Sequence, residues 1–141
     1  MKYLGKSLLV GILVFVAAGC GGRPMLPRLD SNAVVLACGD SLTSGEGASP
    51  ATAYPAVLSA LTGLKVVNAG NPGEVSDDGL ARLFSALAEH KPDLVILCHG
   101  GNDLLQDMDR AALERNLSAM ITAIRESGSA AILVAVPKPG L

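Results

Sequence analysis

The stretch V-V-L-A-C-G-D-S-L-T-S, residues 34–44, decides the fold that this sequence predicts. Its apolar residues and a cysteine run directly into Gly39, Asp40 and Ser41, which is the pattern of a short buried strand that ends in a tight turn. In an open α/β sheet, ligands bind beyond the carboxyl ends of the strands. Ser41 is therefore expected either to face a substrate or, as a purely structural alternative, to cap the next helix.

Short apolar runs of the same kind recur along the sequence, and segments with helical periodicity separate them. Thr52 and Ser76 are the expected N-caps of the first two helices. A loop is expected at residues 99–103, before the last helix. The expected strands are residues 34–38, 65–68, 93–98 and 130–136, and the expected helices begin at Ala53, directly after Ser76 and near Arg110.

This alternation of nearly continuous apolar strands with helices predicts an α/β domain in which helices cover both faces of a parallel sheet. The expected spatial order of the strands is 2-1-3-4. Right-handed crossovers place the loops that follow the strands along one edge of such a sheet. Ser41, Gly73 and Asn102 lie in three of these loops and are therefore expected to converge.

The three loops together carry groups that acyl transfer needs. A serine hydroxyl is a poor nucleophile until a base takes its proton, and the oxyanion that forms needs hydrogen-bond donors aimed at it. Ser41 would supply the nucleophile and its own backbone N–H. Gly73 lets a backbone N–H approach a ligand with no Cβ in the way, and Asn102 offers a side-chain N–H. These groups make a hydrolytic half-site.

Three sequence blocks at these positions resemble those of a known enzyme family. G-D-S-L at residues 39–42, Gly73 after the second strand, and G-G-N-D at residues 100–103 are similar to the first three blocks of the SGNH, or GDSL-type, hydrolases. The resemblance implies Ser41 as the nucleophile. It also implies an oxyanion hole made of the Ser41 N–H, the Gly73 N–H and the Asn102 side chain.

The same resemblance implies a fold and a function. The fold is a flavodoxin-like three-layer α/β/α arrangement around a parallel sheet. The wider group includes arylesterases, thioesterases, lysophospholipases and carbohydrate acetylesterases. The implied function is that of a serine esterase, which hydrolyses carboxylic esters or thioesters (aryl, short acyl or lysophospholipid esters) through an acyl-serine intermediate.

The fourth block of that family, an Asp-x-x-His that supplies the general base and its partner, has no match in this sequence. We therefore expect residues 33–141 to be an incomplete SGNH hydrolase domain without its last strand and helix. His90 is expected at the carboxyl end of a helix, on the opposite edge of the sheet from Ser41. His99 lies at the correct edge, but its position at a strand end suits packing better than catalysis.

Expectations for the 141 residues alone follow from the missing block. They should hydrolyse esters poorly or not at all, and the exposed edge of the fourth strand should make residues 21–141 alone aggregation-prone or molten. Two alternatives to the hydrolase stay open. One is a non-catalytic envelope lipoprotein, or an inactive fragment, that binds an acyl or ester ligand. The other is a flavodoxin-like binding domain in which G-D-S-L occurs by chance.

The amino terminus has the pattern of an export signal. Lys2 and Lys6 precede the apolar run at residues 8–18, and the small residues A-A-G lead directly to Cys20. A cysteine at this point resembles the lipobox of bacterial lipoproteins, which implies cleavage before Cys20 and lipid attachment to it. An ordinary secretory signal is the alternative.

The chain organisation that follows has three parts. Residues 1–19 are expected to be a lipoprotein signal peptide, residues 20–32 a lipidated tether rich in glycine and proline, and residues 33–141 the folded domain. The expected location is the bacterial cell envelope, anchored by lipid to the outer membrane and facing the periplasm. The membrane is then a partner through the anchor.

Composition argues against other classes of function. A net charge of −2 with scattered basic residues argues against nucleic acid as a partner, and 3% aromatic residues with no Trp argue against a stacking platform for bases. No dinucleotide or phosphate-binding loop is present, so no cofactor is expected. Cys38, Cys98 and His99 lack the close spacing of metal ligands, and both cysteines are expected to be buried thiols.

Overall fold

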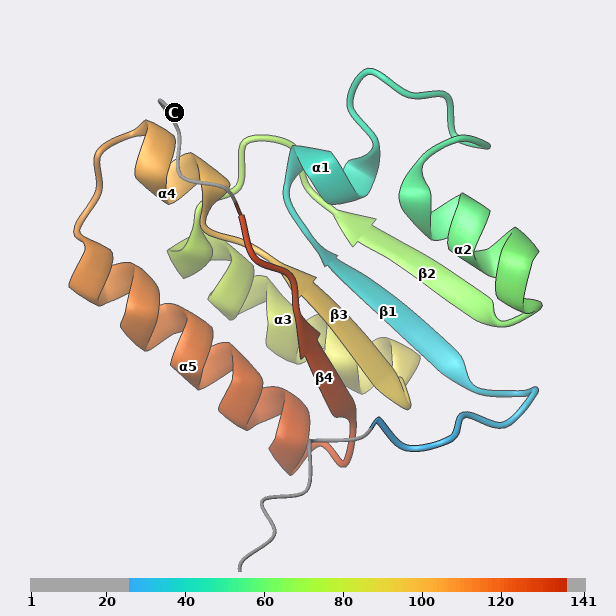
Figure 1. Cartoon of the computed structure of the whole chain (residues 1–141). Helices are drawn as coiled ribbons and strands as arrows, with labels where there is room; N and C mark the ends of the chain where they lie inside the picture. The colour runs from blue at the N-terminus through green and yellow to red at the C-terminus, as the bar shows by residue number, and fades with distance from the viewer. Residues whose placement is uncertain (1–25, 137–141) are drawn as a thin grey trace, which may run out of the picture.

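Four short apolar runs form one parallel sheet in the computed structural model, which describes residues 26–136 (Figure 1). The strands are β1 (Val34–Gly39), β2 (Lys65–Gly70), β3 (Leu94–Cys98) and β4 (Ala130–Leu133). They lie in the order β2-β1-β3-β4, and each neighbouring pair is parallel. The predicted order and direction of the strands are therefore confirmed.

Helices lie on both faces of this sheet, as predicted. They are α1 (Ser41–Ser44), α2 (Tyr54–Thr62), α3 (Ser76–His90), α4 (Gly101–Leu105) and α5 (Arg110–Glu126). Figure 1 shows α3 and α5 side by side on one face, and α2 beside β2 on the other. The arrangement is the expected three-layer α/β/α fold. Within residues 26–136, no helix combines the length and the apolar character that crossing a membrane requires.

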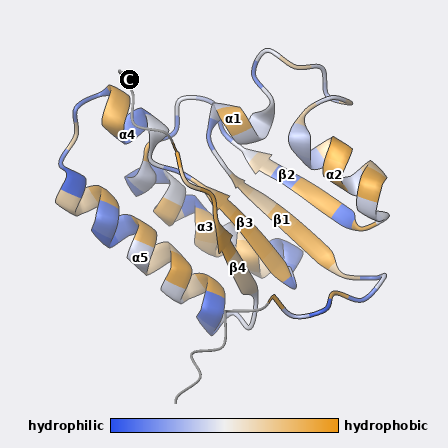
Figure 2. Ribbon diagram, in the orientation of Figure 1, coloured by the Kyte–Doolittle hydropathy of each residue, from blue (hydrophilic) through white to orange (hydrophobic). Residues whose placement is uncertain are grey.

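The main core lies between the sheet and the helices α3 and α5. Leu36 and Val95 of the two central strands are fully buried, and they cluster with Leu83 of α3 and with Met120 and Ile124 of α5. Figure 2 shows the hydrophobic colour continuing along β1 and β3, the strands that have a neighbour on each side. Their near-continuous apolar sequence follows from this burial on both faces.

Some apolar positions that match the helical period are not buried. Leu61 of α2 is 81% exposed and Phe84 of α3 is 59% exposed. Each helix touches the sheet along one narrow stripe, so a residue at the margin of the periodic pattern faces solvent. Periodicity therefore located the helices more accurately than it located their buried faces.

The predicted N-caps of α2 and α3 are wrong. Thr52 precedes the cap position of α2, which is Ala53, and the Thr52 hydroxyl instead accepts a hydrogen bond from Ser49 N at 2.9 Å. Ser76 is the first residue of α3 rather than its cap, and its side chain turns away to Asp103. In both cases the hydroxyl has a partner outside the helix that it was expected to start.

Two other boundaries differ from the sequence prediction. The expected loop at residues 99–103 contains the start of the short helix α4, because Gly100 adopts a positive φ of 108° and turns the chain sharply. The fourth strand ends at Leu133 rather than at residue 136. It forms one edge of the described sheet and pairs only with β3. Aggregation along this edge stays a prediction.

The amino-terminal expectations are not tested by the structure. The predicted signal peptide and the predicted lipid attachment at Cys20 lie outside the described residues. Residues 26–32 form no helix or strand, and Ala33, at 5% exposure, is buried directly before β1 begins.

The cysteines of the two central strands lie on opposite faces of the sheet. Cys38 pairs in register with Leu97, whereas Cys98 pairs with Gly39, and successive residues of a strand point to opposite faces. Both thiols are free and buried, as predicted. Burial raises the pKa of Cys38 to about 11 and also raises the pKa of Cys98.

Raised pKa values and burial together should make both thiols inert in the folded protein. In a Cys20→Ser variant, we expect no reaction with an aromatic disulfide reagent at pH 8, because the reactive species is the exposed thiolate. Two thiols should react once denaturant is added, which is the control. Rapid labelling of the folded variant would contradict the prediction.

Candidate active site

Ser41 lies where β1 ends and α1 begins, in a turn that only glycine allows. A methyl group on Gly39 would lie 2.2 Å from Thr43 Oγ1 and 2.6 Å from the Cys98 carbonyl oxygen. Asp40, which is 2% exposed, is the N-cap of α1, and its carboxylate accepts a hydrogen bond from Leu42 N at 3.0 Å. The structural alternative for Ser41 is therefore wrong, because Asp40 caps the helix and Ser41 is its first residue.

Ser41 and Asn102 line the same hollow. This hollow has a volume of about 210 Å³ and lies at the carboxyl edge of the sheet. Its walls are mostly apolar, which suits the hydrocarbon part of a ligand, and its polar groups come from the two predicted site residues and Asp40. The lining residues are Asp40, Ser41, Leu42, Gly101, Asn102, Leu105 and Val136.

Gly73 does not line this hollow. It lies in an exposed turn, closed by a hydrogen bond from Glu74 N to the Asn71 carbonyl at 3.2 Å, and its φ of 78° favours glycine. The turn is joined to the end of β1, because Asn71 N donates to the Gly39 carbonyl at 2.9 Å. The loop of Gly73 thus meets the loop of Ser41 as predicted, but Gly73 itself is not among the residues that line the hollow.

The side chain of Asn102 is held by the loop that follows β2. Its Nδ2 donates a hydrogen bond of 2.9 Å to the Glu74 carbonyl oxygen. An amide nitrogen carries two hydrogens, so one fixes the side chain and the second is available to an oxyanion. All three predicted loops are therefore connected at this edge of the sheet (Figure 1).

A second, buried connection joins the starts of α3 and α4. The carboxylate of Asp103, which is 3% exposed, accepts hydrogen bonds from Ser76 N at 2.9 Å and from the Ser76 hydroxyl at 2.5 Å. Asn116 of α5 donates to Ser76 Oγ at 3.0 Å. The Asp103 carboxylate thus accepts its hydrogen bonds from another loop. Nothing in the sequence indicated that Asn116 belongs to this cluster.

Glu74, the buried carboxylate that directly follows Gly73, was also missed. Arg82 of α3 binds it with two hydrogen bonds, of 2.8 Å to Oε1 and 2.7 Å to Oε2, and Asn71 adds a third. Burial alone would raise the pKa of Glu74, but these hydrogen bonds and the Arg82 charge outweigh it and lower the pKa. A glutamate directly after Gly73 was the only signal in the sequence.

Neither histidine is placed to take a proton from Ser41. His90 ends α3, as predicted. The side chain of His99 is fully buried, and its Nε2 lies 3.4 Å from Glu74 Oε2. Within residues 26–136, no histidine lines the hollow that holds Ser41. In the same part of the chain, no three His, Cys, Asp or Glu side chains gather as a metal site would require.

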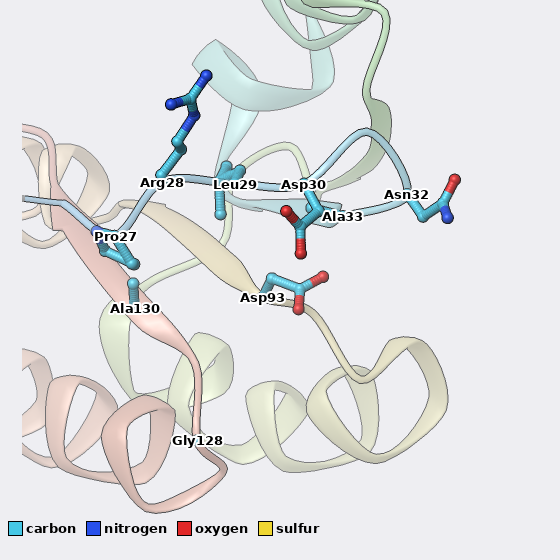
Figure 3. Close-up of a pocket in the computed structure, with 9 residues that line it drawn as sticks. All are labelled: Pro27, Arg28, Leu29, Asp30, Asn32, Ala33, Asp93, Gly128 and Ala130. Carbon is cyan, nitrogen blue, oxygen red and sulfur yellow. The ribbon is translucent and has the colours of Figure 1, made fainter.

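A larger hollow, of about 410 Å³, lies at the opposite edge of the sheet (Figure 3). Asp93 lines it, but its carboxylate accepts a hydrogen bond of 2.8 Å from Val34 N and so belongs to the framework of the sheet. No serine or cysteine nucleophile lines this hollow, and ligands of open α/β sheets bind at the other edge. The hollow at Ser41 is therefore the candidate active site.

Comparison with known proteins identifies the family of this chain. The sequence pattern of the GDSL-like lipase/acylhydrolase family matches residues 37–141. The chain belongs to this family. Its matched region begins inside β1 and includes Ser41, Gly73 and Asn102.

Individual relatives support the same assignment. Esterase TesA of Pseudomonas aeruginosa is 34% identical over 127 residues, which cover 86% of this chain and 63% of the relative. Thioesterase 1/protease 1/lysophospholipase L1 of Escherichia coli is 34% identical over 107 residues, which cover 74% of this chain and 51% of the relative. The chain thus spans between half and two thirds of the length of these relatives.

A solved structure shows the same fold. The crystal structure of AlinE4, described as an SGNH-hydrolase family esterase, has a TM-score of 0.72 and is 31% identical in sequence. The match covers 79% of this chain and 63% of that chain. The SGNH fold predicted from three sequence blocks is therefore confirmed.

Removing the Asp103 carboxylate should destabilise the fold. In Asp103→Ala, two buried donors of Ser76 lose their acceptor, which should lower the free energy of unfolding by about 3 kcal/mol. Urea unfolding followed by circular dichroism measures this change. Glu114→Ala, on the exposed face of α5, is the matched control and should change stability by less than about 0.5 kcal/mol. Equal effects of the two substitutions would contradict the prediction.

The buried imidazole of His99 should make stability depend on pH. Burial, partly opposed by Glu74, Asp40 and Asp103 and assisted by the Arg82 charge, lowers the pKa of His99 below 6.5. The unfolded chain therefore binds the proton first as the pH falls. Stability from this group is complete above about pH 6.5 and declines below it, by at most about 1.4 kcal/mol per pH unit.

Urea unfolding between pH 7.5 and pH 5 would measure this decline. The native protein should lose more stability over that interval than a His99→Leu variant, in which the other titrating groups are unchanged. Identical pH profiles for the two proteins would show that His99 does not titrate differently in the folded state.

Proposed function

We propose that this protein is a serine esterase, which hydrolyses carboxylic esters or thioesters through an acyl-serine intermediate at Ser41. The observation that carries the proposal is the shared hollow, in which the first residue of α1 and the Asn102 amide lie at the carboxyl edge of a parallel sheet. Membership of the GDSL-like lipase/acylhydrolase family supports the same chemistry.

In the proposed reaction, Ser41 Oγ attacks the carbonyl carbon of the ester and loses its proton to a base. The carbonyl oxygen becomes an oxyanion, which the free N–H of the Asn102 side chain would stabilise together with the Ser41 and Gly73 backbone N–H groups. The C–O or C–S bond of the ester breaks, and the alcohol or thiol leaves with the proton that the base took from Ser41. Water then gives a proton to the base and attacks the acyl carbon, and the acid leaves as Ser41 Oγ regains a proton. The N–H of Ser41 lies at the start of α1 and has no acceptor inside its own helix, so it is available to the oxyanion.

The walls of the hollow suggest the class of ester. Leu42 and Leu105 are 60% and 69% exposed, which leaves their apolar surface available to a ligand. The E. coli relative is named a thioesterase and lysophospholipase, and the P. aeruginosa relative an esterase. We propose aryl esters, short acyl esters or lysophospholipids as substrates for this protein.

Among residues 26–136, no histidine lines the Ser41 hollow to accept the proton of the serine. For that reason, the intact mass of the protein isolated from its native cells should be measured before any activity assay. A mass above that of residues 20–141 with acyl chains would lead to a search for Asp-x-x-His in the remainder. Acyl groups on Cys20 in the same spectrum would support the proposed lipoprotein of the outer membrane.

Ser41→Ala should abolish hydrolysis by the protein isolated from its native cells. Loss of a serine nucleophile typically lowers kcat by a factor on the order of a thousand or more. Release of nitrophenol from an aryl ester measures this, with a thioester and a lysophospholipid as further substrates. Ser85→Ala, at an exposed position of α3, is the matched control and should retain full activity.

Two outcomes would overturn the proposal. Turnover that survives in Ser41→Ala would exclude Ser41 as the nucleophile. Ester binding without turnover, unchanged in Ser41→Ala, would favour the alternative of a non-catalytic lipoprotein that binds an acyl or ester ligand.

A further inference from the structure

The environment of His99 makes a histidine side chain costly for the stability of the fold, so a functional role would explain its presence. Its side chain is fully buried, and neither Nδ1 nor Nε2 has a hydrogen-bond partner among the described residues. Unpartnered buried nitrogens cost stability, whereas an apolar side chain of similar size would cost none. The proposed esterase reaction gives this imidazole no role, because it does not line the hollow of Ser41.

The imidazole is also held in one position. Its ring packs against Gly79 in the first turns of α3, where a methyl group would lie 2.6 Å from His99 Cε1 and 2.7 Å from Nε2. Glycine inside a helix is itself unfavourable relative to alanine. At position 79, it leaves the space that the His99 ring occupies.

The polar atom nearest to His99 Nε2 belongs to the carboxylate of Glu74. The two atoms are 3.4 Å apart, slightly beyond the geometry of a hydrogen bond. The Glu74 carboxylate already accepts hydrogen bonds from Arg82 and Asn71, and an ionised carboxylate has room for a fourth. A movement of a few tenths of an ångström would bring Nε2–H into bonding distance.

Glu74 connects this ring to the proposed oxyanion hole. Its side chain faces His99 and Arg82, its carbonyl oxygen accepts the hydrogen bond from Asn102 Nδ2, and it directly follows Gly73 in the chain. A shift of the Glu74 side chain would therefore be transmitted to two donors of the proposed oxyanion hole, the Gly73 N–H and the Asn102 amide. His99 itself directly precedes the G-G-N-D segment that carries Asn102.

We propose that His99 is a positioning residue, which donates a hydrogen bond from Nε2–H to Glu74 and thereby fixes the carbonyl that orients the Asn102 amide. Nδ1 is then the unprotonated ring nitrogen. The kinetic part of this inference rests on the proposed esterase function. The structural part, the link between His99, Glu74 and Asn102, does not.

The kinetic test uses His99→Leu and His99→Gln in the protein isolated from its native cells, with an aryl ester as substrate. Loss of an oxyanion-hole donor costs about a hundredfold or more in kcat, and a misplaced donor should cost less. We expect His99→Leu to lower kcat roughly tenfold with KM within about twofold. His99→Gln should recover most of the activity, because its amide nitrogen can donate from a position close to that of Nε2.

The chain provides a second histidine as a control and Glu74 as the partner for a coupling test. His90→Gln, at the carboxyl end of α3, changes the other histidine and should leave kcat and KM unchanged. In a Glu74→Gln background, His99→Leu should have little further effect on kcat, because both substitutions break the same link. Independent, multiplicative effects would show that His99 does not act through Glu74.

Thermal unfolding separates positioning from packing. We expect the Tm of His99→Leu at pH 7.5 to stay close to that of the native protein, since the hydrogen bond to Glu74 is lost while leucine removes the unpartnered Nδ1 from the interior. A lower kcat accompanied by a lower Tm, without recovery in His99→Gln, would overturn the proposal and leave His99 a purely structural residue. An unchanged kcat in His99→Leu would also overturn it.

Nuclear magnetic resonance decides the inference if the native protein shows no Ser41-dependent turnover. That result would refute the proposed function alone. In ¹⁵N-labelled protein, a slowly exchanging His99 Nε2–H and a shift of the Asn102 side-chain amide resonances in His99→Leu would support the link. Asn102 resonances that stay in place in His99→Leu would refute it.

Discussion

The hydrogen bonds that the Asp103 carboxylate accepts from Ser76 are the constraint on which the site depends. A parallel sheet determines where its strands end, but the loops beyond those ends are otherwise free to move. Asp103 and Ser76 are 27 positions apart in the sequence, and both are buried where they meet. Separating them would leave a carboxylate without donors in a low-dielectric environment, which is strongly unfavourable. The starts of α3 and α4 are therefore held together before any ligand arrives.

The paired side chains of Glu74 and Arg82 extend this constraint toward the hollow. Asn102 precedes Asp103, and its amide is fixed by the carbonyl of Glu74, whose own side chain is held by Arg82 of α3. Donors fixed in this way need no reorganisation when charge develops on a bound ester, which is the condition for effective electrostatic stabilisation. The buried polar network thus fixes the geometry of the site as well as contributing to stability.

The fold could be predicted from the sequence because its signals are local. Each strand is a short apolar run, the helices repeat at the helical period, and the handedness of the crossovers orders the loops along one edge. The error at Ser76 has a physical cause outside its own segment. Ser76 satisfies the local rule for N-caps, yet its hydroxyl has a charged acceptor, Asp103, in another loop. A charge-assisted hydrogen bond is stronger than a cap, so the contact between loops prevails.

The residues of the site also differ in whether local sequence signals predict them. Ser41 and Asn102 sit in short sequence blocks, and they were predicted to meet because the sheet topology brings their loops together. Glu74 and His99 form no such block, because a charged side chain that becomes buried looks in sequence like one that stays in solvent. The only local trace of their contact is Gly79, a glycine inside a helix that leaves room for the ring of His99. Sequence blocks thus mark the groups that would touch a substrate, whereas the groups that hold them become visible only when helix α3 is packed against the end of β3.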